Sequence, residues 1–337
     1  VYKRQGLGCG RTCLLPMPGM AQSCGAASAS WSSAPCARSA DIRRRWLESV
    51  RLQVRVASMT AALDPVKTGT AKLRDHLASG DLSAAALAKT CTTRIEDREA
   101  DIGAWEWFDA RRFLREAERL DAFLQAGGPP GPLHGLPVGL KDIIDTAGIP
   151  TENGCPVDAG RVPERDATIV KRLRAAGAII AGKTVTTELA YLHPNRTRNP
   201  RNVAHTPGGS SSGSAAAVAD GMIPLAIGTQ TAGSVIRPAA FCGITGFKPS
   251  FGAIPRDGVL LQSHSLDTVG VFAQDPAGAA LLADVLIGAE GRKPDSASGL
   301  FQRAQEACRT DPRFAVVRPP GWENADPAMA SAFGEFC

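Results

Sequence analysis

The alternation of short apolar runs with amphipathic stretches after residue 131 constrains the fold more than any other feature of this sequence. The apolar runs are four or five residues long, as buried strands are, and lie at 136–140, 178–181, 224–227 and 244–247. Helix-like periodicity occupies residues 166–176 and 275–287. This alternation is typical of an α/β protein in which helices pack on the faces of a central sheet.

Before this region, apolar residues recur every three or four positions over 83–99 and 109–125, which predicts two helices. After it, residues 313–317 suggest a buried strand, and a further helix is expected after Asn324. The chain ends at Cys337, partway into that helix. We therefore expect the sequence to be truncated at its C-terminus.

The net charge of +5 is unevenly distributed along the chain. Residues 1–58 carry nine basic and two acidic side chains (+7), so residues 59–337 carry 29 basic and 31 acidic ones (−2). Because the basic excess belongs to the leader and aromatic residues make up only 5%, no nucleic-acid partner is expected. We expect residues 1–58 to be disordered or not native, an organellar transit peptide being the alternative. Residues 59–337 then form one domain.

No apolar stretch approaches the roughly 18 residues that span a membrane, so no membrane segment is expected. The cysteines after the leader are scattered, without a CxxC pair or metal-ligand spacing. We predict that they are buried thiols in a reducing compartment, which favours a cytoplasmic protein. They are Cys91, Cys155, Cys242, Cys308 and Cys337.

Two loops of small residues carry the strongest functional signals. Residues 207–217 are rich in Gly and Ser and pass directly into an Ala-rich helical run, as a backbone-lined loop at a helix N-terminus would. Residues 228–238 follow an apolar strand and carry Ser234 in a turn of small residues. Successive N–H groups of such a turn can converge on an oxyanion, and Ser234 is a candidate nucleophile that needs a base.

The candidate base is Lys141, which ends the apolar run 136–140. Burial at the end of a strand would lower the pKa of its amine and favour the neutral form. None of the five histidines lies in a recognisable triad context. A histidine base therefore has less support than the lysine.

Two motif matches have the wrong structural context. Residues 177–184 fit the phosphate-loop pattern GxxxxGK[ST], but a helix precedes them and the variable positions form an apolar strand. Residues 209–213 fit the GxSxG nucleophile elbow, but the preceding segment 202–207 is polar and interrupted by proline. We reject the first as an ATP site and keep the second as the weaker enzymatic alternative.

Between about residues 131 and 272, the sequence resembles the amidase signature family. The resemblance rests on the Gly-Leu-Pro-Val-Gly-Leu-Lys-Asp segment, the Gly-Gly-Ser-Ser-Ser-Gly loop, the Ala-Gly-Ser turn and the segments 238–249 and 265–270. It implies an α/β fold with a central mixed, twisted β-sheet covered by helices on both faces. It implies neither a cofactor nor a metal.

The family's Ser-Ser-Lys triad matches Lys141, Ser210 and Ser234, the two serines being 24 residues apart. The resemblance implies that Ser234 attacks the amide and that Ser210, after a non-proline cis peptide, relays the proton to Lys141. Ser211 and Arg237 would support the triad. The oxyanion hole would consist of the backbone N–H groups of Thr231, Ala232, Gly233 and Ser234.

The sequence departs from the family at two positions of the turn. Gln230 stands where many members have Asp, which would remove a carboxylate partner of Arg237, and Ala232 stands where many have Gly. The C-terminal portion, which in the family lines much of the acyl pocket, is also expected to be missing.

We therefore predict an amidohydrolase that cleaves the C–N bond of a small-molecule amide through an acyl-enzyme. One alternative is the glutaminase-type component of a tRNA-dependent amidotransferase, its A subunit. Another is an inactive truncated fragment. A homodimer is left open, and the sequence does not name the amide.

Overall fold

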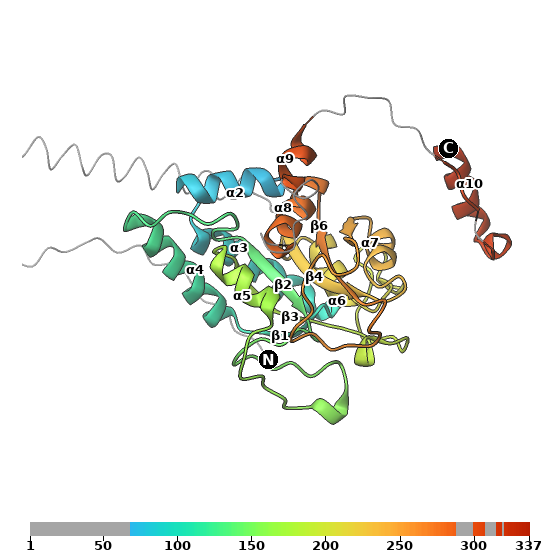
Figure 1. Ribbon diagram of the computed structural model, residues 1–337, viewed down its shortest axis with the longest axis horizontal. Coiled ribbons are helices and arrows are strands. Elements are labelled where there is room, and N and C mark those ends of the chain that lie inside the picture. Colours follow the sequence, from blue (N-terminus) through green and yellow to red (C-terminus); the bar gives the residue numbers. More distant parts are fainter. Residues whose placement is uncertain (1–67, 288–298, 307–314, 319) are drawn as a thin grey trace, which may run out of the picture. The chain divides into compact units, whose positions relative to one another are not determined.

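The computed structural model describes residues 68–287, 299–306, 315–318 and 320–337 (Figure 1). The leader at 1–58 lies outside the described residues, as does Cys308. The division into a leader and one domain therefore stays a prediction.

A six-stranded mixed sheet forms the centre of the described chain, in the order β1-β3-β2-β4-β6-β5. β2 runs parallel to both β3 and β4, whereas the pairs β1/β3, β4/β6 and β5/β6 are antiparallel. The central mixed sheet was predicted and is confirmed. The strands are β1 (Trp105–Phe108), β2 (Pro137–Lys141), β3 (Ile179–Thr184), β4 (Leu225–Gln230), β5 (Thr245–Phe247) and β6 (Thr268–Ala273).

The four apolar runs singled out in the sequence are strands β2 to β5. β1 and β6 were not predicted, because β1 is a four-residue segment between two helices and β6 is interrupted by Gly270. The prediction of a strand at 313–317 is wrong for the residues of this segment that the structure describes. Residues 315–318 belong to no strand, and Val316 and Val317 are 54% and 71% exposed.

Helices lie on both sides of the sheet (Figure 1). The Ser83 and Asp109 side chains cap α3 and α4 by accepting hydrogen bonds from backbone N–H groups of the first turn. Among the described residues, no helix has the length and apolar character needed to cross a membrane. The helices are α2 (Thr70–Ser79), α3 (Ala84–Ile102), α4 (Ala110–Gln125), α5 (Thr168–Ala175), α6 (Ser212–Ala219), α7 (Ile236–Cys242), α8 (Pro276–Ile287), α9 (Leu300–Gln305) and α10 (Pro327–Phe336), with short 3₁₀ turns at Pro156–Asp158, Glu188–Ala190 and Trp322–Asn324.

The predicted burial of the cysteines is confirmed in part. Cys91, Cys155 and Cys242 are buried and free, and burial raises the pKa of the Cys91 and Cys242 thiols to about 12. Cys337 is also free but exposed, so the prediction was wrong there. Its position at the end of α10, whose described residues include no buried one, explains the exposure.

Helix α6 packs directly against the centre of the sheet, contacting β2, β3, β4 and β6. Gly213 permits this approach, because a Cβ there would stand 2.2 Å from Ala104 O and 2.4 Å from Val185 N. One residue further along, the Ser214 hydroxyl donates to Ile227 O at 2.9 Å and shares a 2.7 Å hydrogen bond with Thr184 Oγ1. The start of α6 is thereby held against β3 and β4.

Substituting Gly213→Ala should destabilise the fold by about 2–3 kcal/mol. The added methyl group would clash with main-chain atoms of Ala104 and Val185, which cannot move aside as a flexible side chain would. Chemical denaturation followed by circular dichroism measures the effect. Gly334→Ala is the matched control, because a Cβ at Gly334 in α10 meets nothing within 4 Å. Equal midpoints for the two variants would contradict the packing described for α6.

Candidate active site

Lys141 is the last residue of β2, and its side chain is fully buried. The Nζ atom donates to Ser210 Oγ at 2.7 Å and to Thr229 Oγ1 at 2.9 Å. Ser210 comes from the loop before α6, and Thr229 lies on β4, which runs parallel to β2. Three elements thus meet at one amine.

Burial lowers the pKa of the Lys141 amine to about 7, and the negative charge of Asp267 limits this fall. An ordinary lysine is charged at neutral pH. With a pKa near 7, a substantial fraction of Lys141 is neutral and can accept a proton. The burial and the lowered pKa that the sequence led us to expect are therefore present, and the role of the amine as a base stays a prediction.

The Gly209–Ser210 peptide is cis, as the resemblance implied. The Gly209 carbonyl accepts two hydrogen bonds from Arg237, from Nε at 3.1 Å and from Nη2 at 2.8 Å. Arg237 thus finds its partner in a main-chain carbonyl next to Ser210, and no carboxylate is needed for that role.

Ser211 connects the same loop to β4. Its hydroxyl donates to Thr229 O and accepts from Thr229 N, both at 3.2 Å, and its side chain is fully buried. Thr229 therefore contacts Lys141 through its side chain and Ser211 through its backbone. No direct contact between Ser211 and the lysine is found among the described residues, so any support that it gives passes through the backbone of β4.

Ser234 lies in the turn between β4 and α7 and is 8% exposed. Among the described residues, its hydroxyl makes no hydrogen bond, so the structure links Lys141 to Ser210 but not Ser210 to Ser234. Within the same part of the chain, no partner is found for four successive backbone N–H groups of this turn, which remain available as donors to an oxygen atom. They belong to Thr231, Ala232, Gly233 and Ser234.

Two residues of the site were not singled out from the sequence. Thr229 accepts from Lys141, as described above, and Asp267 accepts a hydrogen bond from Thr231 Oγ1. The second Asp267 oxygen accepts from the backbone N–H groups of Gln262 and Ser263, at 2.6 and 2.9 Å. Asp267 lies within the segment 265–270, which carried the family resemblance, and Thr229 lies in the loop 228–238, which carried a functional signal.

Lys183, the lysine of the phosphate-loop pattern, is also fully buried and is, with Lys141, one of two such lysines in the described part of the chain. Thr184 lies beside Lys141 in the register of β2 and β3, so the side chain of Lys183 points to the other face of the sheet. Its Nζ donates to Ile144 O at 2.8 Å and Thr151 Oγ1 at 2.6 Å, and it lies 3.3 Å from Asp142 Oδ1. Burial lowers its pKa to about 8, which the carboxylate partly counteracts.

The structural context supports the rejection of the phosphate-loop match and counts against the GxSxG alternative. Residues 179–184 of the phosphate-loop pattern are themselves strand β3. Turns and bends, with no strand, precede the GxSxG segment. In the described part of the chain, no histidine is hydrogen-bonded to Ser210, Ser211 or Ser234, and no group of three potential metal ligands occurs.

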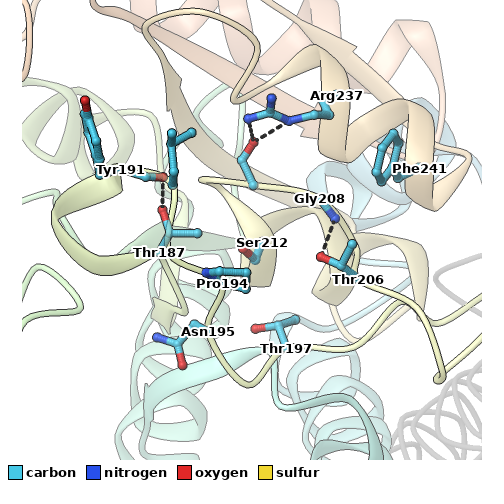
Figure 2. A pocket seen from close by; sticks show the side chains of 12 residues that line it. Thr187, Tyr191, Pro194, Asn195, Thr197, Thr206, Gly208, Ser212, Arg237 and Phe241 are labelled. Carbon is cyan, nitrogen blue, oxygen red and sulfur yellow. Dashed lines mark hydrogen bonds between the residues drawn. The ribbon is translucent and has the colours of Figure 1, made fainter. Parts of the chain in front are cut away.

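Two cavities lie close to these elements. The first, of about 240 Å³, is lined by Gly209 of the cis peptide and by Ser212, and its only charged lining residue is Arg237 (Figure 2). The second, of about 480 Å³, includes Gln262, which accepts a hydrogen bond from Thr231 Oγ1 at 3.1 Å. Tyr191 lines both.

The α/β fold and this arrangement of a lysine with small-residue loops agree with the architecture that the sequence resemblance implied. Residues 86–337 match the family model described as Amidase. The chain therefore belongs to the amidase family, as the sequence resemblance indicated.

Individual relatives agree with this assignment. Over 234 residues, the chain is 42% identical to the A subunit of the glutamyl-tRNA(Gln) amidotransferase of Symbiobacterium thermophilum, covering 67% of this chain and 48% of that protein. The solved peptide amidase of Stenotrophomonas maltophilia is 35% identical with a TM-score of 0.63, over 72% of this chain and 51% of that one. The chain thus spans about half the length of these relatives.

The Thr229→Val variant should lower the pKa of Lys141 below its native value, because the charged amine loses a hydrogen-bond acceptor. NMR titration of the Lys141 side-chain signals measures this pKa, which we expect near 7 in the native protein. Thr229→Ser keeps the hydroxyl and should keep the native value. An unchanged pKa in Thr229→Val would contradict this role of the threonine.

The same pKa has a consequence for stability. The unfolded chain, with a lysine pKa near 10.5, binds more protons than the folded protein above pH 7. The contribution of Lys141 to stability therefore rises with pH between about 7 and 10.5, where the folded protein holds the amine neutral.

Proposed function

We propose that the protein hydrolyses carboxylic amides through Lys141, Ser210 and Ser234. The observation that carries the proposal is the 2.7 Å hydrogen bond between Ser210 Oγ and a buried lysine amine whose pKa is near 7. This pair can accept a proton from a neighbouring hydroxyl. Ser234, at 8% exposure and without a side-chain hydrogen bond in the described structure, is the hydroxyl that this pair would activate.

In this mechanism, Ser234 Oγ attacks the amide carbonyl carbon. Its proton passes to Ser210 Oγ as the Ser210 proton passes to Lys141 Nζ. Collapse of the tetrahedral intermediate breaks the C–N bond, and Lys141 returns the proton through Ser210 to the leaving nitrogen. A water molecule, activated by the same relay, then hydrolyses the acyl ester on Ser234.

The negative oxygen of each tetrahedral intermediate is stabilised by the N–H groups of the turn 231–234, which have no partner within the described ranges. The Gly209 carbonyl, next to Ser210 in the chain, accepts two hydrogen bonds from Arg237. The positive guanidinium offsets the negative end of this carbonyl dipole. The lining of the first cavity, with one cation and otherwise uncharged residues, favours a substrate group without a positive charge.

Replacing Ser234→Ala in the purified protein should lower amide turnover by about 10⁴-fold or more, because the acyl-enzyme can no longer form. Release of amine from a panel of amides measures the loss, and circular dichroism checks the fold. Ser250→Ala, at an exposed serine, is the control and should retain native turnover. If Ser234→Ala keeps measurable turnover, Ser234 is not the nucleophile.

A second candidate is glutamine hydrolysis within a tRNA-dependent amidotransferase, because several similar proteins are named as the A subunit of such an enzyme. The net charge of −2 on residues 59–337 does not suggest a surface for tRNA on this part of the chain. Preferential hydrolysis of glutamine over other amides, together with co-purification of a partner, would favour this candidate. We also propose a cytoplasmic location, which the buried free thiols support.

A further inference from the structure

Gln230 is the last residue of β4, directly before the turn 231–234 with its four successive N–H groups. Its side chain is 8% exposed, and both ends of its carboxamide hydrogen-bond to protein. On β4 it follows Thr229, the partner of Lys141. The residue therefore stands between the lysine and the turn.

The Gln230 carbonyl oxygen Oε1 accepts two hydrogen bonds from the far end of the turn. The donors are the backbone N–H groups of Val235, at 2.9 Å, and Ile236, at 3.0 Å. These are the two N–H groups that follow Ser234 in the chain. Gln230 thus accepts the hydrogen bonds of these two N–H groups. The four preceding N–H groups have no partner in the described structure.

The other end of the carboxamide acts on the middle of the turn. Gln230 Nε2 donates to Ala232 O at 3.0 Å. In a trans peptide, the C=O and the following N–H point in opposite directions, and the only cis peptide among the described residues is Gly209–Ser210. Holding Ala232 O toward Gln230 therefore turns the N–H of Gly233 away from it.

This set of partners suits a carboxamide. Two N–H donors need an acceptor at one end, and the Ala232 carbonyl needs a donor at the other, and the carboxamide of Gln230 supplies both. A carboxylate could accept from Val235 and Ile236, but its second oxygen would repel Ala232 O. The bonding pattern also fixes which end of the Gln230 side chain is oxygen.

We infer that Gln230 is a positioning residue for the oxyanion-binding turn, its carboxamide orienting the Ala232–Gly233 peptide so that the Gly233 N–H faces the substrate oxygen. The inference rests on the proposed amide hydrolysis. It gives position 230 a function that depends on Gln, although many members of the family have Asp there. The hydrogen bond from the Gly233 N–H stabilises the substrate oxygen mainly when negative charge develops on it in the transition state. Loss of this hydrogen bond should therefore lower kcat more than it raises KM.

Two variants at Gln230 test the inference. Gln230→Glu keeps the acceptor and removes the donor, and Gln230→Met removes both without adding charge. We expect kcat to fall by about 10- to 100-fold in each, with KM nearly unchanged, since a misdirected oxyanion donor costs up to that order. Native kcat in Gln230→Met would overturn the inference.

Gln274 provides the matched control, because its Nε2 also donates to a main-chain carbonyl, that of Val218. Gln274→Glu and Gln274→Met should retain native kcat even if they lower the melting temperature. A fall in kcat at Gln274 as large as that at Gln230 would show general destabilisation and overturn the inference.

Amide hydrogen exchange provides a readout that does not depend on turnover. In Gln230→Met, the N–H groups of Val235 and Ile236 should exchange faster than in the native protein, whereas Gln230→Glu should keep their protection. If the native protein hydrolyses no amide, the proposed function fails, and this measurement alone decides whether Gln230 holds the turn. Unchanged exchange in Gln230→Met would overturn the inference.

Discussion

The site depends on the buried hydrogen bond between Lys141 Nζ and Ser210 Oγ. A lysine amine without water is costly to keep charged, and its direct partners among the described residues are two neutral hydroxyls, those of Ser210 and Thr229. The fold meets this requirement by bringing the ends of the parallel strands β2 and β4 together beside the loop that precedes α6. Gly213 lets α6 lie close enough for that loop to reach the lysine.

The two buried lysines show how local partners decide chemistry. Lys183 lies 3.3 Å from the Asp142 carboxylate and donates to two further oxygen atoms, which favours its charged form in a structural contact. Lys141 has no carboxylate within ion-pair distance in the described structure, and Asp267 acts on it only through its charge. Similar burial therefore gives one lysine suited to fastening the loop after β2 to β3 and another suited to accepting a proton.

Much of this was predictable from the sequence, because motifs and strand-length apolar runs are local signals. They identified four strands of the sheet correctly. They also singled out Lys141, at the end of one of these strands, and Ser210, in a loop beside it, which are hydrogen-bonded to each other. The bonds of Thr229 and Gln230 were not predictable, since they depend on strand register and on how a turn folds back on its own strand. The predicted strand at 313–317 failed because an apolar run becomes a strand only where a neighbour pairs with it.

The central claim is that Ser234, activated through Ser210 and Lys141, carries the acyl group. Mass spectrometry after rapid quenching of an amide reaction tests it most directly, because fragmentation of the peptide that contains both serines separates Ser210 from Ser234. The account predicts an acyl group on Ser234 that is absent in Ser234→Ala and that accumulates less in Lys141→Ala. An acyl group on Ser210, or turnover without any acylated serine, would contradict it.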